Sequence, residues 1–189
     1  MPLDKNPGVR PIGVCETVRR IIGKAIMTVA GPAVQEVAGP LQLCAGQAAG
    51  CEAAVHALRG VFASESSDGI LFVDASNAFN SLNRAVALRN ILRICPVIAP
   101  TLINCYRGNA ELFVLGEVLL SQEGTTQGDP LAMAMYALAI VPLMKVGHTP
   151  DALQIWFADD ASAGGRLPAL RSWWDQLSSK GPLFGLPMR

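Results

Sequence analysis

Three aspartates stand directly after short apolar runs and are the strongest candidates for chemistry in this sequence. Asp74 ends a run that begins at Gly69, and Asp159 and Asp160 follow the run 153–158. If the two runs are neighbouring strands, the three carboxylates meet at one edge of a sheet. Two carboxylates about 4 Å apart repel by roughly 4 kcal/mol at an effective dielectric near 20, so such a cluster needs a cation or a retained proton. Ligands that are all oxygen favour Mg²⁺ or Mn²⁺, and bound divalent cations support phosphoryl transfer.

These aspartates could also have purely structural roles. Asp74 alone could cap the turn after its strand, and an adjacent Asp-Asp pair is common in solvated turns. The position directly after a hydrophobic run favours the metal-site hypothesis, but spacing alone leaves both interpretations open. His56 and His148 lie in unrelated contexts, which argues against a histidine-based metal site or catalytic triad.

Alternating helices and strands must position these residues. Helices are predicted over 16–29, 47–63, 82–94, 131–145 and 168–179 from apolar spacing and from Pro and Gly at the ends. Strands are predicted at 69–74 and 153–158, with a return at 161–165 and a hairpin over 111–115 and 117–121. This irregular alternation favours an α+β fold in which helices back a sheet.

Two of the predicted helices differ in their apolar pattern. The helix over 16–29 carries one apolar stripe, which predicts a buried face made of Val18, Ile21, Ile22, Ala25, Ile26 and Val29. Arg19 falls off this stripe and is expected on the exposed side. The helix over 131–145 is apolar on nearly all sides and should be deeply buried, with Asp129-Pro130 as its start.

The composition predicts a folded protein with a sizeable core. Of its 189 residues, 51% are hydrophobic and 16% are charged, which excludes a disordered chain and a coiled coil. Fifteen basic side chains balance fifteen acidic ones, and this neutrality argues on average against a highly basic nucleic-acid module. Residues 1–24, however, hold five basic and two acidic side chains.

Cysteine usage and the apolar runs bear on the compartment. The five cysteines include no CxxC pair, which favours a reducing environment over a disulfide framework or a zinc site. The N-terminal residues lack the apolar core of a signal peptide, and the longest apolar run, 131–144, is too short to cross a bilayer. We therefore expect an intracellular protein of the nucleus or cytoplasm, neither secreted nor membrane-bound.

Five segments, in order, resemble the sequence motifs of reverse transcriptases. They are Arg10-Pro11-Ile12 with Thr17-Val-Arg19-Arg20, Phe72-Val-Asp74-Ala-Ser-Asn-Ala-Phe79-Asn, Gly124-Thr-Thr-Gln127-Gly128-Asp129-Pro130-Leu131, Phe157-Ala-Asp-Asp160 and Gly181-Pro-Leu-Phe-Gly185. The ordered set covers nearly the whole chain and is most similar to enzymes of non-LTR retrotransposons and group II introns. The resemblance implies a polymerase palm, an antiparallel sheet with helices packed on one face, plus part of the fingers. It assigns residues 1–66 to partial fingers and 67–189 to a palm that stops before the thumb.

The resemblance also implies a metal site and a nucleotide site. Catalytic Asp74 and Asp159, assisted by Asp160, would bind Mg²⁺, with Mn²⁺ as a substitute and the carbonyl of Ala75 as a further ligand. Phe79 would lie under the incoming sugar and select deoxynucleotides, although its sequence context alone favours core packing.

Three further residues would complete the nucleotide site. Gln127 and Gly128, which form only a turn without the resemblance, would border the nucleotide, and the glycine would allow close backbone approach. Arg10, otherwise a solvated loop residue, would reach the triphosphate, because a planar guanidinium suits phosphate oxygens.

The activity that the resemblance implies is that of an RNA-directed DNA polymerase of a retroelement. The 3′-OH of a DNA primer would attack the α-phosphate of a dNTP on an RNA template, with pyrophosphate leaving and two Mg²⁺ ions stabilising the charge. The thumb and other domains of a longer polyprotein are expected partners, and the 189 residues alone are expected to be weak or inactive. One alternative is a non-catalytic retroelement remnant that binds nucleic acid or protein. Another is a carboxylate-metal phosphohydrolase or nuclease, which has no use for Phe79 or Gln127-Gly128.

Overall fold

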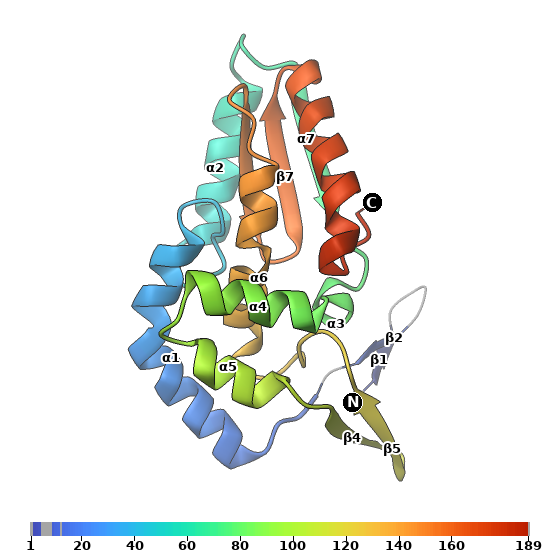
Figure 1. Ribbon diagram of the computed structural model, residues 1–189. Helices are drawn as coiled ribbons and strands as arrows, with labels where there is room; N and C mark the ends of the chain where they lie inside the picture. Colours follow the sequence, from blue (N-terminus) through green and yellow to red (C-terminus); the bar gives the residue numbers. More distant parts are fainter. Residues whose placement is uncertain (1, 5–8, 12, 189) are drawn as a thin grey trace.

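The computed structural model describes residues 2–4, 9–11 and 13–188 (Figure 1). Its elements, in chain order, are β1 (Pro2–Asp4), β2 (Val9–Pro11), α1 (Thr17–Ala38), α2 (Gly50–Phe62), β3 (Gly69–Asp74), α3 (Ala78–Ser81), α4 (Arg84–Ile94), α5 (Ala99–Tyr106), β4 (Ala110–Val114), β5 (Glu117–Ser121), α6 (Ala132–Val146), β6 (Ala152–Phe157), β7 (Asp160–Gly165), α7 (Leu167–Lys180) and the 3-10 helix η1 (Gly181–Phe184). The predicted helices and strands are all present, with shifted ends. Near the N-terminus, β1 and β2 pair antiparallel, and the sequence patterns did not predict these two short strands.

The central sheet has three antiparallel strands in the order β3-β7-β6. Strand β3 pairs with β7 from Gly69 opposite Gly165 to Asp74 opposite Asp160, and β6 pairs with β7 up to Phe157 opposite Asp160. Because β3 and β6 both run antiparallel to β7, they end at the same edge of the sheet. The two apolar runs of the sequence are therefore strands whose aspartate ends lie together, with β7 between them.

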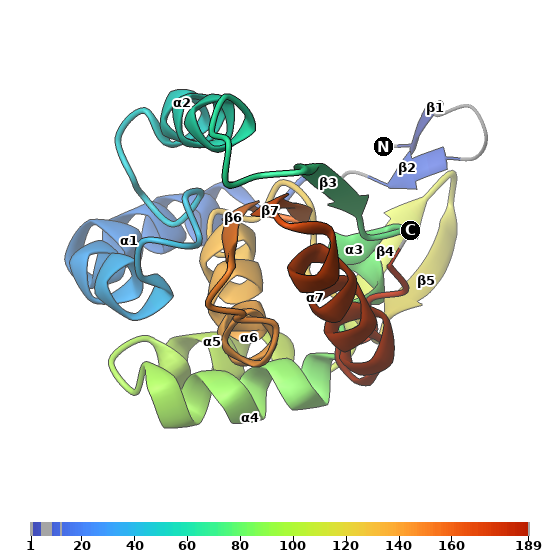
Figure 2. The same cartoon turned by 90° about the horizontal axis from the view of Figure 1, so that it is seen from above.

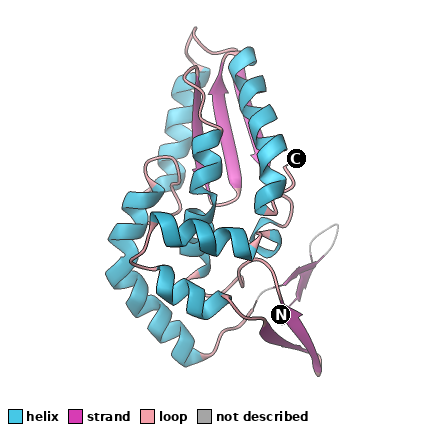
Figure 3. Ribbon diagram, viewed as in Figure 1, coloured by secondary structure: helices cyan, strands magenta, loops and turns pink. Residues whose placement is uncertain are grey.

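Helices cover both faces of this sheet, as the fold seen from above shows (Figure 2). Helices α6 and α7 lie on the face that buries Val73, Ala161 and Trp156. Helix α2 lies on the other side and contacts all three strands. Its Val61 packs so closely at Gly164 that a Cβ there would lie 2.7 Å from the Val61 Cγ1. The architecture is therefore α+β, with mostly helical layers around a small sheet (Figure 3).

Helix α6 is the centre of the core, as its uniformly apolar sequence predicts. Eleven of its fifteen residues are buried, and α1, α4 and α7 all contact it. A helix with no polar face is stable only when other elements surround it. Among the described residues, no helix is both long enough and apolar enough to span a bilayer.

Helix α1 is longer than predicted and faces the core with a different side. The predicted stripe is wrong, because Val18, Ile21, Ile22 and Val29 are between 53% and 82% exposed. The buried positions are instead Gly23, Ala30, Val34 and Ala38. Arg19 lies on the same side of the helix as these buried positions and points toward Asp129. The small residues on this side allow close contact with the segment before α6. A Cβ on Gly23 would lie 3.2 Å from the Pro130 Cβ.

The predicted β4–β5 hairpin is confirmed, with Val114 opposite Glu117 as its last register pair. Its two turn residues, Leu115 and Gly116, have φ values of 53° and 86°. Two positive φ angles are what a tight two-residue hairpin turn requires. The hairpin lies apart from the central sheet and next to the segment that leads into α6 (Figure 1).

Candidate functional site

Asp74 and Asp160 face each other at the edge of the sheet. They are Cα partners in the antiparallel β3–β7 pair, so their side chains project to the same face. Both residues are exposed, whereas the neighbouring partners Val73 and Ala161 are buried on the opposite face. Like charges directly opposite each other destabilise an antiparallel pair. A bound cation would remove this repulsion.

Asp159 lies in the two-residue turn that joins β6 to β7. Phe157 and Asp160 are the last register partners, which leaves Ala158 and Asp159 as the turn itself. Ala158 has a φ of 55°, a left-handed conformation that costs a residue with a Cβ about 1–2 kcal/mol. Contacts from outside the turn must therefore hold it.

The structure thus brings Asp74, Asp159 and Asp160 to one edge of the sheet. The arrangement is a facing pair with the third carboxylate next to it in the chain. Within residues 2–4, 9–11 and 13–188, no three His, Cys, Asp or Glu side chains close into a metal-binding group. Ala75, whose carbonyl is expected as a further ligand, is buried and forms an isolated bridge with Met188.

A buried tyrosine lies behind the carboxylates. Burial raises the pKa of the Tyr136 hydroxyl, and the negative charges of Asp159 and Asp74 raise it further. The Tyr136 oxygen is buried and has no hydrogen-bond partner among the described residues. Its ring stacks on Phe79 at a centroid distance of 4.4 Å. Phe79 therefore packs on the core, as its sequence context predicts, while its contact with a sugar stays a prediction.

The donor chemistry of this edge fits a hard divalent cation. The three side chains offer only carboxylate oxygens, which Mg²⁺ and Mn²⁺ prefer. The facing pair of Asp74 and Asp160 concentrates negative charge at an exposed position. The unpartnered Tyr136 hydroxyl adds a buried polar atom beside the same carboxylates.

The segment 124–131 packs against the residues that follow β3. The Gly124 N–H donates to the Leu82 carbonyl at 2.8 Å, and the Thr125 N–H donates to the Phe79 carbonyl at 2.6 Å. Gly124 has a φ of 69°, and a Cβ there would lie 2.3 Å from the Phe79 carbonyl oxygen. Only glycine fits this position, so the start of the segment is tied to α3.

Gln127 and Gly128 stand where this segment turns toward α6. The Gln127 carbonyl accepts a hydrogen bond from the Gly13 N–H at 2.8 Å. Gly128 is exposed and has a φ of 104°, which favours glycine. Arg10 lies in β2 opposite Leu3, but its side chain falls outside the described part of the structure. Its contact with a triphosphate stays a prediction.

An ion pair between the partly exposed Arg19 and the buried Asp129 precedes α6, and sequence reasoning missed it. The Arg19 guanidinium donates to Asp129 Oδ2 with its Nε at 3.1 Å and a terminal nitrogen at 2.5 Å. The Tyr106 hydroxyl donates to the same oxygen at 2.8 Å, and the Leu131 N–H donates to Oδ1 at 2.9 Å. Burial lowers the pKa of Arg19, but hydrogen bonding and the charge of Asp129 outweigh it, so the pKa is raised. Asp129 therefore has a structural role beyond its predicted helix start.

Arg84 is a second buried cation that sequence reasoning missed. Its guanidinium donates to the carbonyls of Gly108, Ser121, Glu123 and Gly124 and to the Ser121 hydroxyl, at 2.8–3.2 Å. Burial lowers its pKa, which the charge of Glu123 opposes. Arg84 thus joins α4, the end of β5 and the start of the segment 124–131. Only its place at a helix start, after Asn83, is visible in the sequence.

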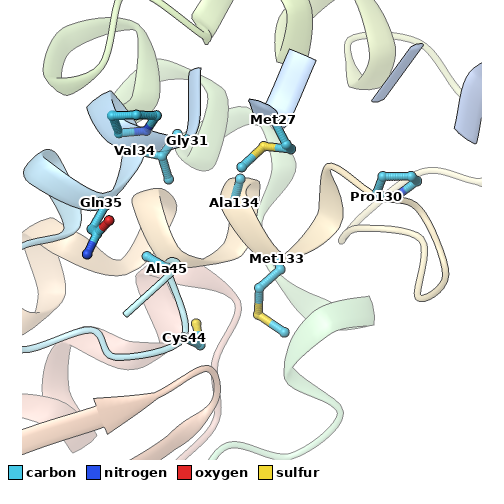
Figure 4. Close-up of a pocket in the computed structure, with 11 residues that line it drawn as sticks. Met27, Gly31, Val34, Gln35, Cys44, Ala45, Pro130, Met133 and Ala134 are labelled. Carbon is cyan, nitrogen blue, oxygen red and sulfur yellow. The ribbon is translucent and has the colours of Figure 1, made fainter. Parts of the chain in front are cut away.

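Two cavities flank the segment that leads into α6. The first, of about 450 Å³, lies between α1, residues 44–46 and the start of α6 (Figure 4). Met27 and Met133 approach it from two helices, and Cys44 lies at its side. Burial raises the pKa of the Cys44 thiol to about 11, and the Ala158 backbone and the charge of Asp159 also act on it. This cavity therefore adjoins the turn that carries Asp159.

The second cavity, of about 720 Å³, lies on the other side, between the start of α1 and the β4–β5 hairpin. Its wall includes Arg19, Tyr106 and Gln127. The buried ion pair and the 124–128 segment therefore share this wall.

The fold is similar to solved telomerase structures, whereas no protein-family model and no curated protein matches the sequence. Apo telomerase from Candida tropicalis, truncated from the C-terminal domain, matches with a TM-score of 0.60 and 11% identity over 90% of this chain and 39% of that chain. Telomerase from Candida albicans, in complex with the TWJ fragment of telomeric RNA, matches with a TM-score of 0.57 and 10% identity over 91% of this chain and 34% of that chain. The corresponding RNA complex from Candida tropicalis gives 0.59 and 12% over 92% and 32%.

At such low identity, these matches establish the fold alone. The chain spans between 32% and 39% of the telomerase chains that it matches. The telomerase matches give no support for the non-LTR or group II type that the motifs resemble. The chain has an α+β fold similar to that of telomerase.

Proposed function

We propose that this chain is the fingers–palm core of an RNA-directed DNA polymerase, which transfers nucleotides from dNTPs to a primer 3′-OH. The observation that carries the proposal is Asp74 facing Asp160 at the sheet edge, with Asp159 in the adjoining turn. This edge belongs to a fold similar to telomerase. Because the telomerases of two matches hold telomeric RNA, an RNA template is the template class we infer.

Asp74, Asp159 and Asp160 would hold Mg²⁺, or Mn²⁺ in its place. Such a cation, when bound, offsets charge on the reacting phosphate and activates the attacking oxygen. The carboxylates themselves lie on an exposed edge, where a primer end and a triphosphate can both approach. Charge neutralisation at this edge is the main contribution we assign to them.

Three other positions would shape the nucleotide site. Gly128 is exposed with a positive φ, which allows a ligand to approach the backbone closely. Phe79, fixed by its stacking on Tyr136, would discriminate against a ribose 2′-OH with the part of its ring that is not buried. Gln127 and Arg10 would contact the nucleotide and its phosphates. The order of the five motifs supports a retroelement enzyme of the non-LTR or group II type.

The test is primer extension by an otherwise complete polymerase that contains this chain, on an RNA template with a DNA primer, dNTPs and Mg²⁺. Asp159→Asn removes one metal ligand and should lower the extension rate by about 10³-fold or more. Asp151→Asn is the matched control, because Asp151 is an exposed aspartate before β6, at the opposite end of that strand. It should extend primers like the wild type. Undiminished extension by Asp159→Asn contradicts the proposal.

A second measurement covers the case of slow extension. Wild-type protein should bind dNTP only when Mg²⁺ or Mn²⁺ is present, and Asp159→Asn should lose that dependence. Absence of metal-dependent dNTP binding in the wild type would favour the non-catalytic remnant. Cleavage of nucleic acid without dNTPs would favour the nuclease.

A further inference from the structure

The turn that carries Asp159 depends on support from elsewhere in the fold. Ala158 and Asp159 are its only two residues, between the register partners Phe157 and Asp160. Ala158 takes a φ of 55°, which is unfavourable for any residue with a Cβ. A turn of this kind persists when the surroundings determine its conformation.

Gln42 supplies this support from a distant part of the chain. Its side-chain Oε1 accepts a hydrogen bond from the Ala158 N–H at 2.9 Å, and its Nε2 donates to the Ala158 carbonyl at 3.3 Å. Gln42 is 0% exposed. Its backbone is fixed by a parallel bridge to Trp156, in which Trp156 donates to Leu41 and accepts from Leu43, both at 2.8 Å.

Building on the proposed function, we infer that Gln42 is a positioning residue, which fixes the Ala158–Asp159 turn so that Asp159 stands beside the facing carboxylates. Both polar atoms of its side chain bind the backbone of the one residue that precedes Asp159. Asp159 therefore lies between Ala158, which Gln42 holds, and Asp160, which is the register partner of Asp74. Partners that orient a metal ligand typically change metal affinity or activity by about 10–100-fold.

The chemistry of this contact requires a carboxamide. Ala158 presents one donor and one acceptor, and an amide offers the matching acceptor and donor on one rigid plane. An apolar side chain of similar size fills the space of Gln42 but makes neither bond. Leucine and methionine are such replacements, one branched and one flexible.

A second buried amide, in strand β6, provides the matched control. Gln154 on β6 is 2% exposed and donates to the Met144 carbonyl at 2.9 Å. Its Oε1 accepts from Trp156 Nε1 and Trp173 Nε1, both at 3.1 Å. Gln154→Leu therefore removes buried hydrogen bonds of the same kind without touching the turn.

The direct test is hydrogen exchange of the Ala158 amide by NMR, in the complete 189-residue chain. In Gln42→Leu this amide should exchange about 10-fold faster, which is the effect of losing one hydrogen bond. In Gln154→Leu it should keep the wild-type rate. If Gln42→Leu does not fold, Gln42→Met serves in its place. An unchanged Ala158 rate in the Gln42 variant overturns the inference.

The functional test is Mn²⁺ titration followed by electron paramagnetic resonance. The Gln42 variant should bind Mn²⁺ at least about 10-fold more weakly than the wild type, whereas Gln154→Leu should bind like the wild type. In primer extension, kcat should fall by a similar factor while KM for dNTP stays constant. Equal losses in the Gln42 and Gln154 variants would mean general destabilisation and would overturn the positioning role.

The two proposals fail in different ways. If the wild type binds Mn²⁺ no better than Asp159→Asn, the proposed function fails, and the inferred role of Gln42 fails with it. If Asp159→Asn abolishes Mn²⁺ binding but the Gln42 variant binds like the wild type, only the positioning role fails.

Discussion

Asp129 and Asp160 belong to two charged regions of this fold that balance their charges differently. Around Asp129, whose side chain is 0% exposed, the Arg19 guanidinium, the Tyr106 hydroxyl and a backbone N–H all donate to one carboxylate. At the sheet edge, Asp160 is exposed and directly opposite Asp74. The first region pairs a buried carboxylate with a partly exposed cation, and the second places like charges at the surface.

The difference suggests a structural role for the region around Asp129 and a ligand-binding role for the sheet edge. A buried carboxylate that already has a cation and hydrogen-bond donors has little capacity left for a ligand. Removing one partner of such a pair leaves the other charge uncompensated, which destabilises the fold. Two exposed carboxylates that face each other lower stability slightly but can take up a cation. Both regions adjoin helix α6. Asp129 lies just before this helix, and Tyr136, whose pKa the sheet-edge carboxylates raise, lies within it.

The largest expected effect concerns the buried pair. Arg19→Met leaves Asp129 buried without its cation. Because Arg19 itself is partly exposed, we expect the free energy of unfolding to fall by about 3 kcal/mol, the low end of the cost of breaking a buried pair. Urea denaturation followed by circular dichroism measures this change. Combining Arg19→Met with Asp129→Asn removes the orphaned charge and should recover part of the loss. A double variant that is less stable than Arg19→Met would contradict this account.

An exposed pair on α7 provides the control. Arg171 and Asp175 pair at 2.9 Å with side chains that are 77% and 55% exposed. Arg171→Met should change the free energy of unfolding by no more than about 0.5 kcal/mol. A cost similar to that of Arg19→Met would mean that burial does not distinguish the two pairs.

The next effect concerns Arg84, which joins the buried region to the 124–131 segment. Arg84→Met removes the donors of five hydrogen bonds to residues between Gly108 and Gly124. We expect a loss of about 1.5–3 kcal/mol in the free energy of unfolding, measured by the same denaturation. Arg84→Lys keeps the charge but not the planar fork, so it should recover only part of the loss. Full recovery by lysine would show that charge alone matters.

The smallest effect has the opposite sign. Asp160→Asn removes the repulsion with Asp74, and without divalent cations we expect it to raise the free energy of unfolding by about 0.2–1 kcal/mol. With Mg²⁺ at 100 times its Kd, the wild type should gain about 2.7 kcal/mol, and the variant should gain less. Denaturation in EDTA and in MgCl₂ measures both terms. A variant that is less stable than the wild type in EDTA would argue against repulsion at this edge.

Local patterns in the sequence were sufficient for much of the fold. The strand ending at Asp74, the β4–β5 hairpin and the buried helix α6 were predicted, because strand patterns, turn residues and apolar composition act within a few residues of the chain. The aspartates at the two strand ends were visible for the same reason. The sequence predicted that they meet at one edge only if the two runs are neighbouring strands, which the sequence itself did not show.

Only the tertiary structure decided which face of α1 is buried and what holds the Ala158–Asp159 turn. Arg19 bonds to a carboxylate 110 positions away, and the face of α1 that carries Arg19 is the one that packs on the core. Gln42 bonds to a backbone 116 positions away, and nothing near it in sequence indicates that role. An apolar pattern reports an average tendency for burial. Pairing of polar groups depends instead on which distant segments approach, and in α1 the buried face carries Arg19 and small residues rather than the apolar stripe.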